Sequence, residues 1–266
     1  VMRLLAKPQG RIASGQILFE GRDIARLDES EMHKIRGDSI SMIFQEPMTS
    51  LNPVYTIGDQ IVEAIRAHRD VPKAKAMEVA LESLVQVGIP DPERRLRSYP
   101  HEMSGGMRQR AMIAMAISCK PKLLIADEPT TALDVTIQAQ ILRLLRDLRE
   151  QMGMSLMLIT HDLGVVAEVA DKVVVMYGGR IAESASTLEL YANPLHPYTR
   201  GLLASRPRID EETRTLYSIP GTVPTIIGDV PGCRFANRCD RVCAKCQSQT
   251  PALREAAQGH FVACWA

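Results

Sequence analysis

Two adjacent carboxylates follow a short apolar segment near the middle of the chain. Asp127 and Glu128 come directly after residues 122–126, Lys-Leu-Leu-Ile-Ala, a pattern that predicts a buried strand. The first carboxylate is suited to holding Mg²⁺ and the second to orienting a water molecule. An acidic pair after a strand is also common at the start of a helix, where the helix dipole favours negative charge. The pair is therefore a candidate catalytic site that needs support from other segments.

A serine and two glycines form a candidate phosphate-binding turn. Ser104, Gly105 and Gly106 directly precede a predicted helix with a buried apolar face. Free backbone N–H groups at such a helix start, together with the helix dipole, can receive a phosphate. The ordinary alternative is a serine N-cap followed by glycines in a turn. The position of the segment, shortly before the acidic strand, favours the phosphate-binding interpretation.

Two further polar residues each follow a predicted strand. Gln45 comes after residues 39–44, and His161 comes after residues 155–160. Taken singly, such residues are usually an exposed glutamine and a structural histidine, and Asp162 beside the histidine could cap a helix. Their order relative to the acidic pair makes them candidates for the same site.

Strands and helices alternate through residues 105–176. Apolar strands are predicted over residues 122–126, 155–160 and 172–176, with helices before and between the first two. This alternation, with fully apolar strands, predicts an α/β fold whose mostly parallel sheet is covered on both faces. Ligand-binding and catalytic residues of such sheets lie at the carboxyl ends of the strands, so we expect Asp127, Glu128 and His161 to belong to a site there.

Two segments depart from the alternation. Apolar residues recur at helical spacing from residue 56 to about 98, which predicts a mostly helical block inserted into the α/β pattern. Prolines punctuate the chain after about residue 186. We therefore place a domain boundary near residue 190 and expect a loop-rich accessory region after it.

Five of the six cysteines lie in the last 34 residues, at Cys233, Cys239, Cys243, Cys246 and Cys264. Because the sequence shows no export signal, this crowding suggests metal ligation before disulfides. Thiolates suit either tetrahedral Zn²⁺ or an iron–sulfur cluster. The alternative is a set of reduced, unliganded thiols in a mobile tail.

The composition excludes some classes of protein. The chain has 32 Lys and Arg against 31 Asp and Glu, a formal net charge of +1, so it has no global attraction for nucleic acid or an anionic bilayer. No apolar run approaches the roughly 18 residues that span a membrane. We expect a soluble, cytosolic protein with no nucleic-acid partner.

The order of the motifs resembles the ATPase domain of ABC transporters over residues 1 to about 185. Gln45 matches the Q-loop, Ser104–Gly106 the signature, Asp127-Glu128 the Walker B motif, Asp134 the D-loop and His161 the switch histidine. The resemblance implies a RecA-like P-loop NTPase core over residues 1–190. That core would carry an inserted helical subdomain at about 56–105 and the remnant of an antiparallel β subdomain.

Finer details resemble the ATPase subunits of bacterial dipeptide, oligopeptide and nickel importers. The matching segments are Phe44–Pro53, Met103–Arg110, Asn193–Thr199, Ile219–Pro224 and Gly232–Phe235. Residues 191–266 then correspond to that subfamily's loop-rich C-terminal extension. The resemblance implies a [4Fe–4S] cluster on Cys233, Cys239, Cys246 and Cys264, with Cys243 as an extra thiol.

The resemblance also implies roles for the site residues. Asp127 would hold Mg²⁺, Glu128 would polarise the attacking water, Gln45 would sense metal and water, and His161 would steady the γ-phosphate. Nucleotide binding would involve Ser104, Gly105, Gly106, Gln109 and Asp134. The signature serine and glycines would serve the ATP held by a partner ATPase.

The implied function is ATP-driven peptide import. The implied partners are two membrane-spanning permease subunits, a second ATPase subunit in a heterodimer and, indirectly, a periplasmic peptide-binding protein. Such a subunit is peripheral, at the cytoplasmic face of the bacterial inner membrane. The alternatives are a soluble ABC protein without membrane partners, or a catalytically silent remnant. The substrate stays open among dipeptides, longer peptides, glutathione and nickel.

One expected motif is absent from the 266 residues, which contain no G-x-x-x-x-G-K-[ST] phosphate loop. The opening residues Val1–Ala6 resemble the end of the helix that follows this loop in the family. We therefore expect the sequence to be a fragment or the product of a truncated gene, and to bind Mg-ATP poorly by itself.

Overall fold

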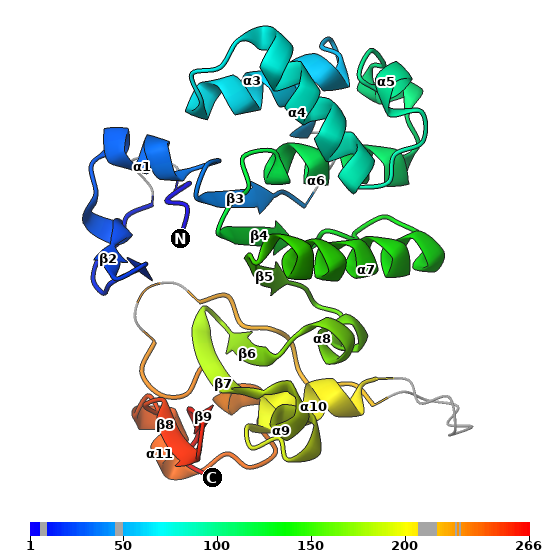
Figure 1. Cartoon of the computed structure of the whole chain (residues 1–266). Coiled ribbons are helices and arrows are strands. Elements are labelled where there is room, and N and C mark those ends of the chain that lie inside the picture. The colour runs from blue at the N-terminus through cyan, green and yellow to red at the C-terminus, as the bar shows by residue number, and fades with distance from the viewer. Residues whose placement is uncertain (6–9, 46–49, 207–216, 227, 229) are drawn as a thin grey trace. The chain divides into compact units, whose positions relative to one another are not determined.

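The computed structural model describes residues 1–266 apart from 6–9, 46–49, 207–216, 227 and 229. Residues 46–49 belong to the predicted Q-loop segment and so lie outside the described residues. The chain forms two compact units, Val1–Ile159 and Thr160–Ala266 (Figure 1). The domain limits predicted from the sequence stay predictions.

The first unit is built on a three-stranded parallel sheet in the order β3-β4-β5. The strands are β3 (Ile40–Ile43), β4 (Leu123–Asp127) and β5 (Ser155–Ile159). Side chains of β4 alternate between two apolar clusters, with Leu124 in one and Ile125 in the other. Both faces of the central strand are thus buried, as its continuous apolar sequence predicts.

Two long helices cover one face of this sheet. Helix α6 (Gly105–Ile117) and helix α7 (Val135–Met152) share the larger apolar cluster with β4. In α7 the buried residues are Ile141, Leu142, Leu145 and Leu148, at the three- to four-residue spacing of a helix with one apolar face.

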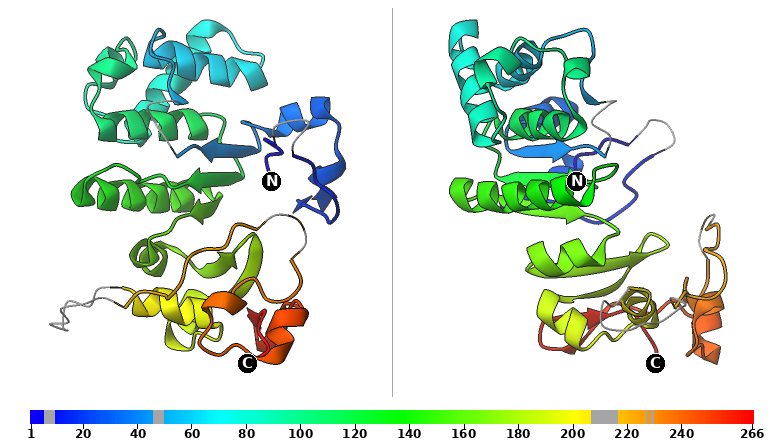
Figure 2. Two further views of the ribbon diagram at one scale, coloured as in Figure 1. Left: turned by 180° about the vertical axis from the view of Figure 1, so that it is seen from behind. Right: turned by 90° about the vertical axis from the view of Figure 1, so that its right-hand side faces the viewer.

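The predicted helical block follows β3 in the chain. It consists of α3 (Ile57–His68), α4 (Lys73–Gln86) and the short α5 (Pro92–Arg95), followed by the 3₁₀ turn η2 (Pro100–Glu102). Thr56 caps α3 by accepting a hydrogen bond from the Asp59 N–H at 3.2 Å. Helices α3 and α4 pack together and against α6 (Figure 2).

The N-terminal segment covers the other face of the sheet. A hairpin of β1 (Leu18–Phe19) and β2 (Arg22–Asp23) leads through η1 (Ile24–Arg26) to α1 (Glu29–Ile35). Asp28 caps α1, with its Oδ1 2.8 Å from the Glu31 nitrogen. Ile24, Met32 and Met2 are buried with Ile125 of β4.

The second unit contains an antiparallel sheet in the order β6-β7-β9-β8. Its strands are β6 (Lys172–Tyr177), β7 (Arg180–Ser186), β9 (His260–Val262) and β8 (Arg254–Ala257). The expectation that the apolar segment 172–176 joins the parallel sheet is wrong. Gly178 and Gly179, both at positive φ, form a two-residue turn that can join only antiparallel neighbours, because a parallel pair needs a long crossover.

Short helices complete the second unit: α8 (Leu163–Val169), α9 (Thr187–Ala192), α10 (Pro197–Ala204), η3 (Ala236–Arg238) and α11 (Ala244–Ser248). Helices α9 and α10 pack on β7. Nowhere in the described ranges is a helix both long and apolar enough to cross a membrane.

Candidate active site

The parallel strands of the first unit end at one edge of their sheet, and the predicted site residues follow from that register. Ile43 of β3 lies opposite Ala126 of β4, and Asp127 lies opposite Ile159 of β5. The chain therefore reaches Gln45 two residues after β3, and Asp127 and Glu128 at the end of β4. The Glu128 N–H continues the ladder by donating to the Ile159 carbonyl at 2.9 Å.

The side chains of Gln45 and Glu128 meet. Gln45 Nε2 donates a hydrogen bond to Glu128 Oε2 at 2.8 Å. The hydroxyl of Thr131 donates to the same oxygen, also at 2.8 Å. Thr131 is a residue that the sequence analysis missed, although a hydroxyl three positions after a glutamate in a proline-containing turn is a recognisable signal.

The backbone at Glu128 is unusual. Its φ is +44°, in the left-handed region that non-glycine residues rarely occupy. The Thr131 N–H donates to the Glu128 carbonyl at 3.1 Å and closes a turn over residues 128–131. Strained positions of this kind persist only where the surroundings hold them, and they concentrate at functional sites.

The oxygen donors at this edge fit a hard cation. Asp127 presents a carboxylate and Gln45 an amide oxygen, both ligand types that Mg²⁺ takes. Mg²⁺ commonly takes one or two protein oxygens and completes its coordination with water and phosphate. The described residues contain no group of three or more His, Cys, Asp and Glu that could hold a metal ion.

The predicted signature turn starts α6. Ser104 is its N-cap, and the serine Oγ accepts a hydrogen bond from the Met107 N–H at 3.3 Å. A Cβ at Gly106 would lie 3.0 Å from Ile137 Cγ2 of α7, whereas one at Gly105 would have ordinary contact with Leu133 at 3.7 Å. The second glycine therefore permits close helix packing, and a phosphate-binding role for the turn stays a prediction.

Two other predicted nucleotide-binding residues lie in or next to a helix. Gln109 lies within α6 with 1% of its surface exposed, and its Nε2 has no hydrogen-bond partner among the described residues. Asp134 is the N-cap of α7, where its Oδ1 accepts from the Ile137 N–H at 3.0 Å. Neither observation tests binding of a nucleotide.

His161 belongs to the second compact unit, immediately before α8. Asp162 caps that helix by accepting a hydrogen bond from the Gly164 N–H at 2.7 Å, as the alternative interpretation of this aspartate predicts. Within one unit, the structure brings Gln45, Glu128 and Thr131 together, and the role of His161 stays a prediction.

Relatives of known annotation align with the whole chain. The peptide ABC transporter ATP-binding protein y4tR of Sinorhizobium fredii, described as probable, is 56% identical over 100% of this chain and 79% of the relative. The oligopeptide transport ATP-binding protein AppD of Bacillus subtilis is 52% identical over 100% of this chain and 81% of the relative. The chain belongs to the ABC transporter family of ATP-binding proteins. These relatives favour neither a soluble ABC protein without membrane partners nor a silent remnant.

Family models and solved structures agree with this membership. The ABC transporter model matches residues 1–131, and the model for the oligopeptide/dipeptide transporter C-terminal region matches residues 182–246. The ATP-binding cassette MJ0796, solved in a post-hydrolysis state with ADP and Pi, has a TM-score of 0.59 at 26% identity, over 67% of this chain and 76% of that one. CbiO1 of Clostridium perfringens has a TM-score of 0.60 at 28% identity, over 68% and 69%. The predicted ABC ATPase fold is confirmed, and ATP with Mg²⁺ is the ligand of this family.

The metal centre predicted for the cysteines of this ABC protein has no support among the described residues, which show no group of three or more His, Cys, Asp and Glu that could hold a metal ion. Cys243 and Cys246 are close, with their Sγ atoms 3.3 Å apart. Burial raises the pKa of Cys233, Cys239 and Cys246. The arrangement therefore gives no support to an iron–sulfur or zinc site.

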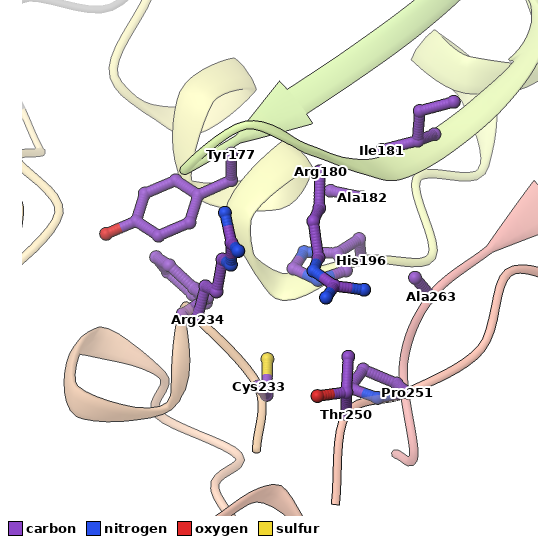
Figure 3. A pocket seen from close by; sticks show the side chains of 11 residues that line it. Tyr177, Arg180, Ile181, Ala182, His196, Cys233, Arg234, Thr250, Pro251 and Ala263 are labelled. Carbon is purple, nitrogen blue, oxygen red and sulfur yellow. The ribbon is translucent and has the colours of Figure 1, made fainter. Parts of the chain in front are cut away.

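A pocket in the second unit lies beside one of these thiols. Figure 3 shows the Cys233 thiol pointing toward the pocket, near His196, Arg180 and Arg234. Tyr177 contributes an aromatic wall and packs edge-on against Phe235, with ring centroids 5.1 Å apart. None of the predicted catalytic residues lines this pocket.

The buried carboxylate of Glu183, beside the pocket, contacts two other segments of the second unit. Glu183 of β7 accepts hydrogen bonds from the Leu195 N–H at 2.7 Å and the His196 N–H at 3.0 Å, and its Oε1 lies 2.7 Å from His260 Nε2 of β9. Burial lowers the pKa of His196 to about 4, although the charge of Glu183 opposes this effect. The sequence analysis found none of these contacts, because their partners lie far apart in the chain.

Proposed function

We propose that this chain is the ATP-hydrolysing subunit of a bacterial peptide importer. The observation that carries the proposal is the Glu128 carboxylate at the carboxyl end of β4, which accepts a hydrogen bond of 2.8 Å from Gln45, two residues after the neighbouring strand β3. The names of the relatives, which include peptide, oligopeptide and dipeptide transport proteins, support the substrate class.

Glu128 acts as the general base in this proposal. Its carboxylate orients the water and takes its proton as the water attacks the γ-phosphate of ATP, and the bond from the γ-phosphorus to the bridging oxygen breaks to release ADP. Gln45 fixes the carboxylate through its hydrogen bond to Oε2. Because both residues extend from the ends of buried parallel strands, the base stands on a rigid part of the fold.

Asp127 and Gln45 would hold Mg²⁺ through their oxygens, and the bound ion would supply positive charge that offsets the charge on the phosphates. His161 donates to the γ-phosphate and stabilises the same charge. The backbone N–H groups of Gly105 and Gly106, at the start of a helix of 13 residues, would receive an anion, because free N–H groups and the helix dipole favour negative charge there.

The remaining nucleotide-binding roles depend on a second ATPase subunit. Ser104 and the signature glycines at the start of α6 contact the ATP of that partner, and Gln109 and Asp134 also take part in nucleotide binding. The complex also contains two membrane-spanning permease subunits and receives its cargo from a periplasmic peptide-binding protein. The chain then works at the cytoplasmic face of the bacterial inner membrane.

The domain organisation is part of the proposal, with an ATPase domain over 1–190 and a C-terminal extension over 191–266. The [4Fe–4S] or Zn²⁺ centre predicted on Cys233, Cys239, Cys246 and Cys264 has no support among the described residues and plays no part in the proposal. Iron, sulfide and zinc contents of anaerobically purified protein check this point directly.

The test of the function is uptake. A strain deleted for the gene that carries this sequence should lose accumulation of labelled di- to pentapeptides, and the gene should restore it. Affinity purification of the tagged protein from detergent-solubilised membranes should recover two multi-spanning membrane proteins. Normal peptide uptake in the deletion strain, with no other ATPase gene of this type expressed, would rule the proposal out.

A further inference from the structure

Thr131 makes two contacts with Glu128 within one turn. Its hydroxyl donates to Glu128 Oε2 at 2.8 Å, and its backbone N–H donates to the Glu128 carbonyl at 3.1 Å. Pro129, between them, is buried. Thr131 therefore contacts both the side chain and the backbone of Glu128.

The two donors to Glu128 Oε2 come from different elements. Gln45 reaches the oxygen from the segment after β3, whereas Thr131 reaches it from the turn after β4. Two donors from different directions restrict the rotation of a carboxylate more than one does. The contact from Thr131 to Glu128 depends only on the local turn, because the two residues are three positions apart in the chain.

The turn over residues 128–131 holds Glu128 in an unusual backbone conformation. At a φ of +44°, the side chain leaves the chain in a direction that an ordinary strand end would not give it. A conformation of this kind needs contacts that hold it in place, and the turn closed by Thr131 supplies them.

We propose that Thr131 is a positioning residue for the general base: its hydroxyl orients the Glu128 carboxylate toward the attacking water. The inference rests on the proposed function, in which Glu128 takes the proton. Without the hydroxyl, Oε2 of the carboxylate loses one donor and keeps the donor from Gln45, so the carboxylate rotates more readily away from the water.

The test compares Thr131→Val, Thr131→Ala and Thr131→Ser in the assembled transporter, purified from cells that express the whole gene carrying this sequence. Valine keeps the shape of threonine and removes the hydroxyl, alanine removes both, and serine keeps the hydroxyl. We expect kcat for ATP to fall between about tenfold and 100-fold in the valine and alanine variants, with KM within about twofold. Serine should restore most of kcat.

Rescue by serine separates positioning from general damage. Serine keeps the hydroxyl but lacks the methyl group of threonine, so damage to packing would persist in Thr131→Ser, whereas loss of the hydrogen bond would not. Thr250→Val is the matched control, since it also removes a threonine hydroxyl, one that donates to the Gly232 carbonyl at 3.1 Å in the other unit.

Two results would overturn the inference: turnover of Thr131→Val within about twofold of the parent, or a serine variant as slow as the valine variant. Glu128→Gln, measured in parallel, tests the proposed function separately. If Glu128→Gln keeps its turnover, the assignment of the base is wrong. If it loses turnover while Thr131→Val does not, only the role of Thr131 is wrong.

Discussion

Gln45 and Glu128 are 83 positions apart in the chain, and their side chains form a hydrogen bond of 2.8 Å from Nε2 to Oε2. The contact exists because β3 and β4 are parallel neighbours, with Ile43 opposite Ala126, so that both residues leave the sheet at one edge. A glutamine and a glutamate from different motifs thus form one hydrogen-bonded pair.

Glu128→Gln should nearly abolish ATP hydrolysis in the assembled transporter and leave ATP binding within about twofold. An amide keeps the size of the side chain but cannot accept the proton, and a general base typically contributes about 10²- to 10⁴-fold in rate. Steady-state phosphate release and binding of a fluorescent ATP analogue measure the two effects. Cys119→Ser, at a buried position outside the site, is the control and should turn over normally.

Gln45→Glu should lower turnover more than Gln45→Leu does. The leucine variant loses one hydrogen bond to Glu128, whereas the glutamate variant places a second carboxylate where the donor was, 2.8 Å from Oε2. Like charges this close favour the protonated form of one of them, so the acidic limb of the pH–rate profile should move to higher pH. Equal turnover in both variants across pH 6 to 9 would argue against the contact.

Gly106→Ala should be less stable than Gly105→Ala by about 1 kcal/mol in free energy of unfolding. A Cβ at position 106 would lie 3.0 Å from Ile137 Cγ2, and a β-branched side chain in a helix cannot easily turn away. The Cβ at position 105 meets Leu133 at an ordinary 3.7 Å. Urea unfolding of both variants measures the difference, and Ile137→Ala should remove it.

Acid should destabilise the fold partly through His196. Its pKa is about 4 in the folded protein, below the usual 6.5, because the side chain is buried. The unfolded chain therefore binds more protons between these values, and stability falls as the pH drops from about 6.5 to about 4. The full effect is about 3 kcal/mol.

His196→Asn tests this acid sensitivity. His196 Nδ1 accepts the Tyr198 N–H at 3.0 Å at the start of α10, and asparagine can replace it as a helix cap. The variant should show a flatter dependence of unfolding free energy on pH between about 4 and 6.5. Parallel curves for variant and parent would contradict the role given to His196.

The sequence by itself determined the features that depend on nearby residues. Apolar runs predicted β4 and β5, helical spacing predicted α3 and α4, and the cap residue Ser104 marks the start of α6. These patterns are readable because strands, helices and caps are set by residues within a few positions of each other. The order of the motifs also led to the family, since that order is itself a property of the sequence.

Only the tertiary structure decided which distant groups meet. The apolar segment that became β6 has the composition of a parallel strand, and only the observed strand order shows that it lies in a different sheet from β4 and β5. The contact of Glu183 with His260 spans 77 positions, and the convergence of Gln45 and Thr131 on one oxygen of Glu128 depends on a positive φ at Glu128. Strand order and side-chain burial arise from packing over the whole chain, so no local pattern specifies them.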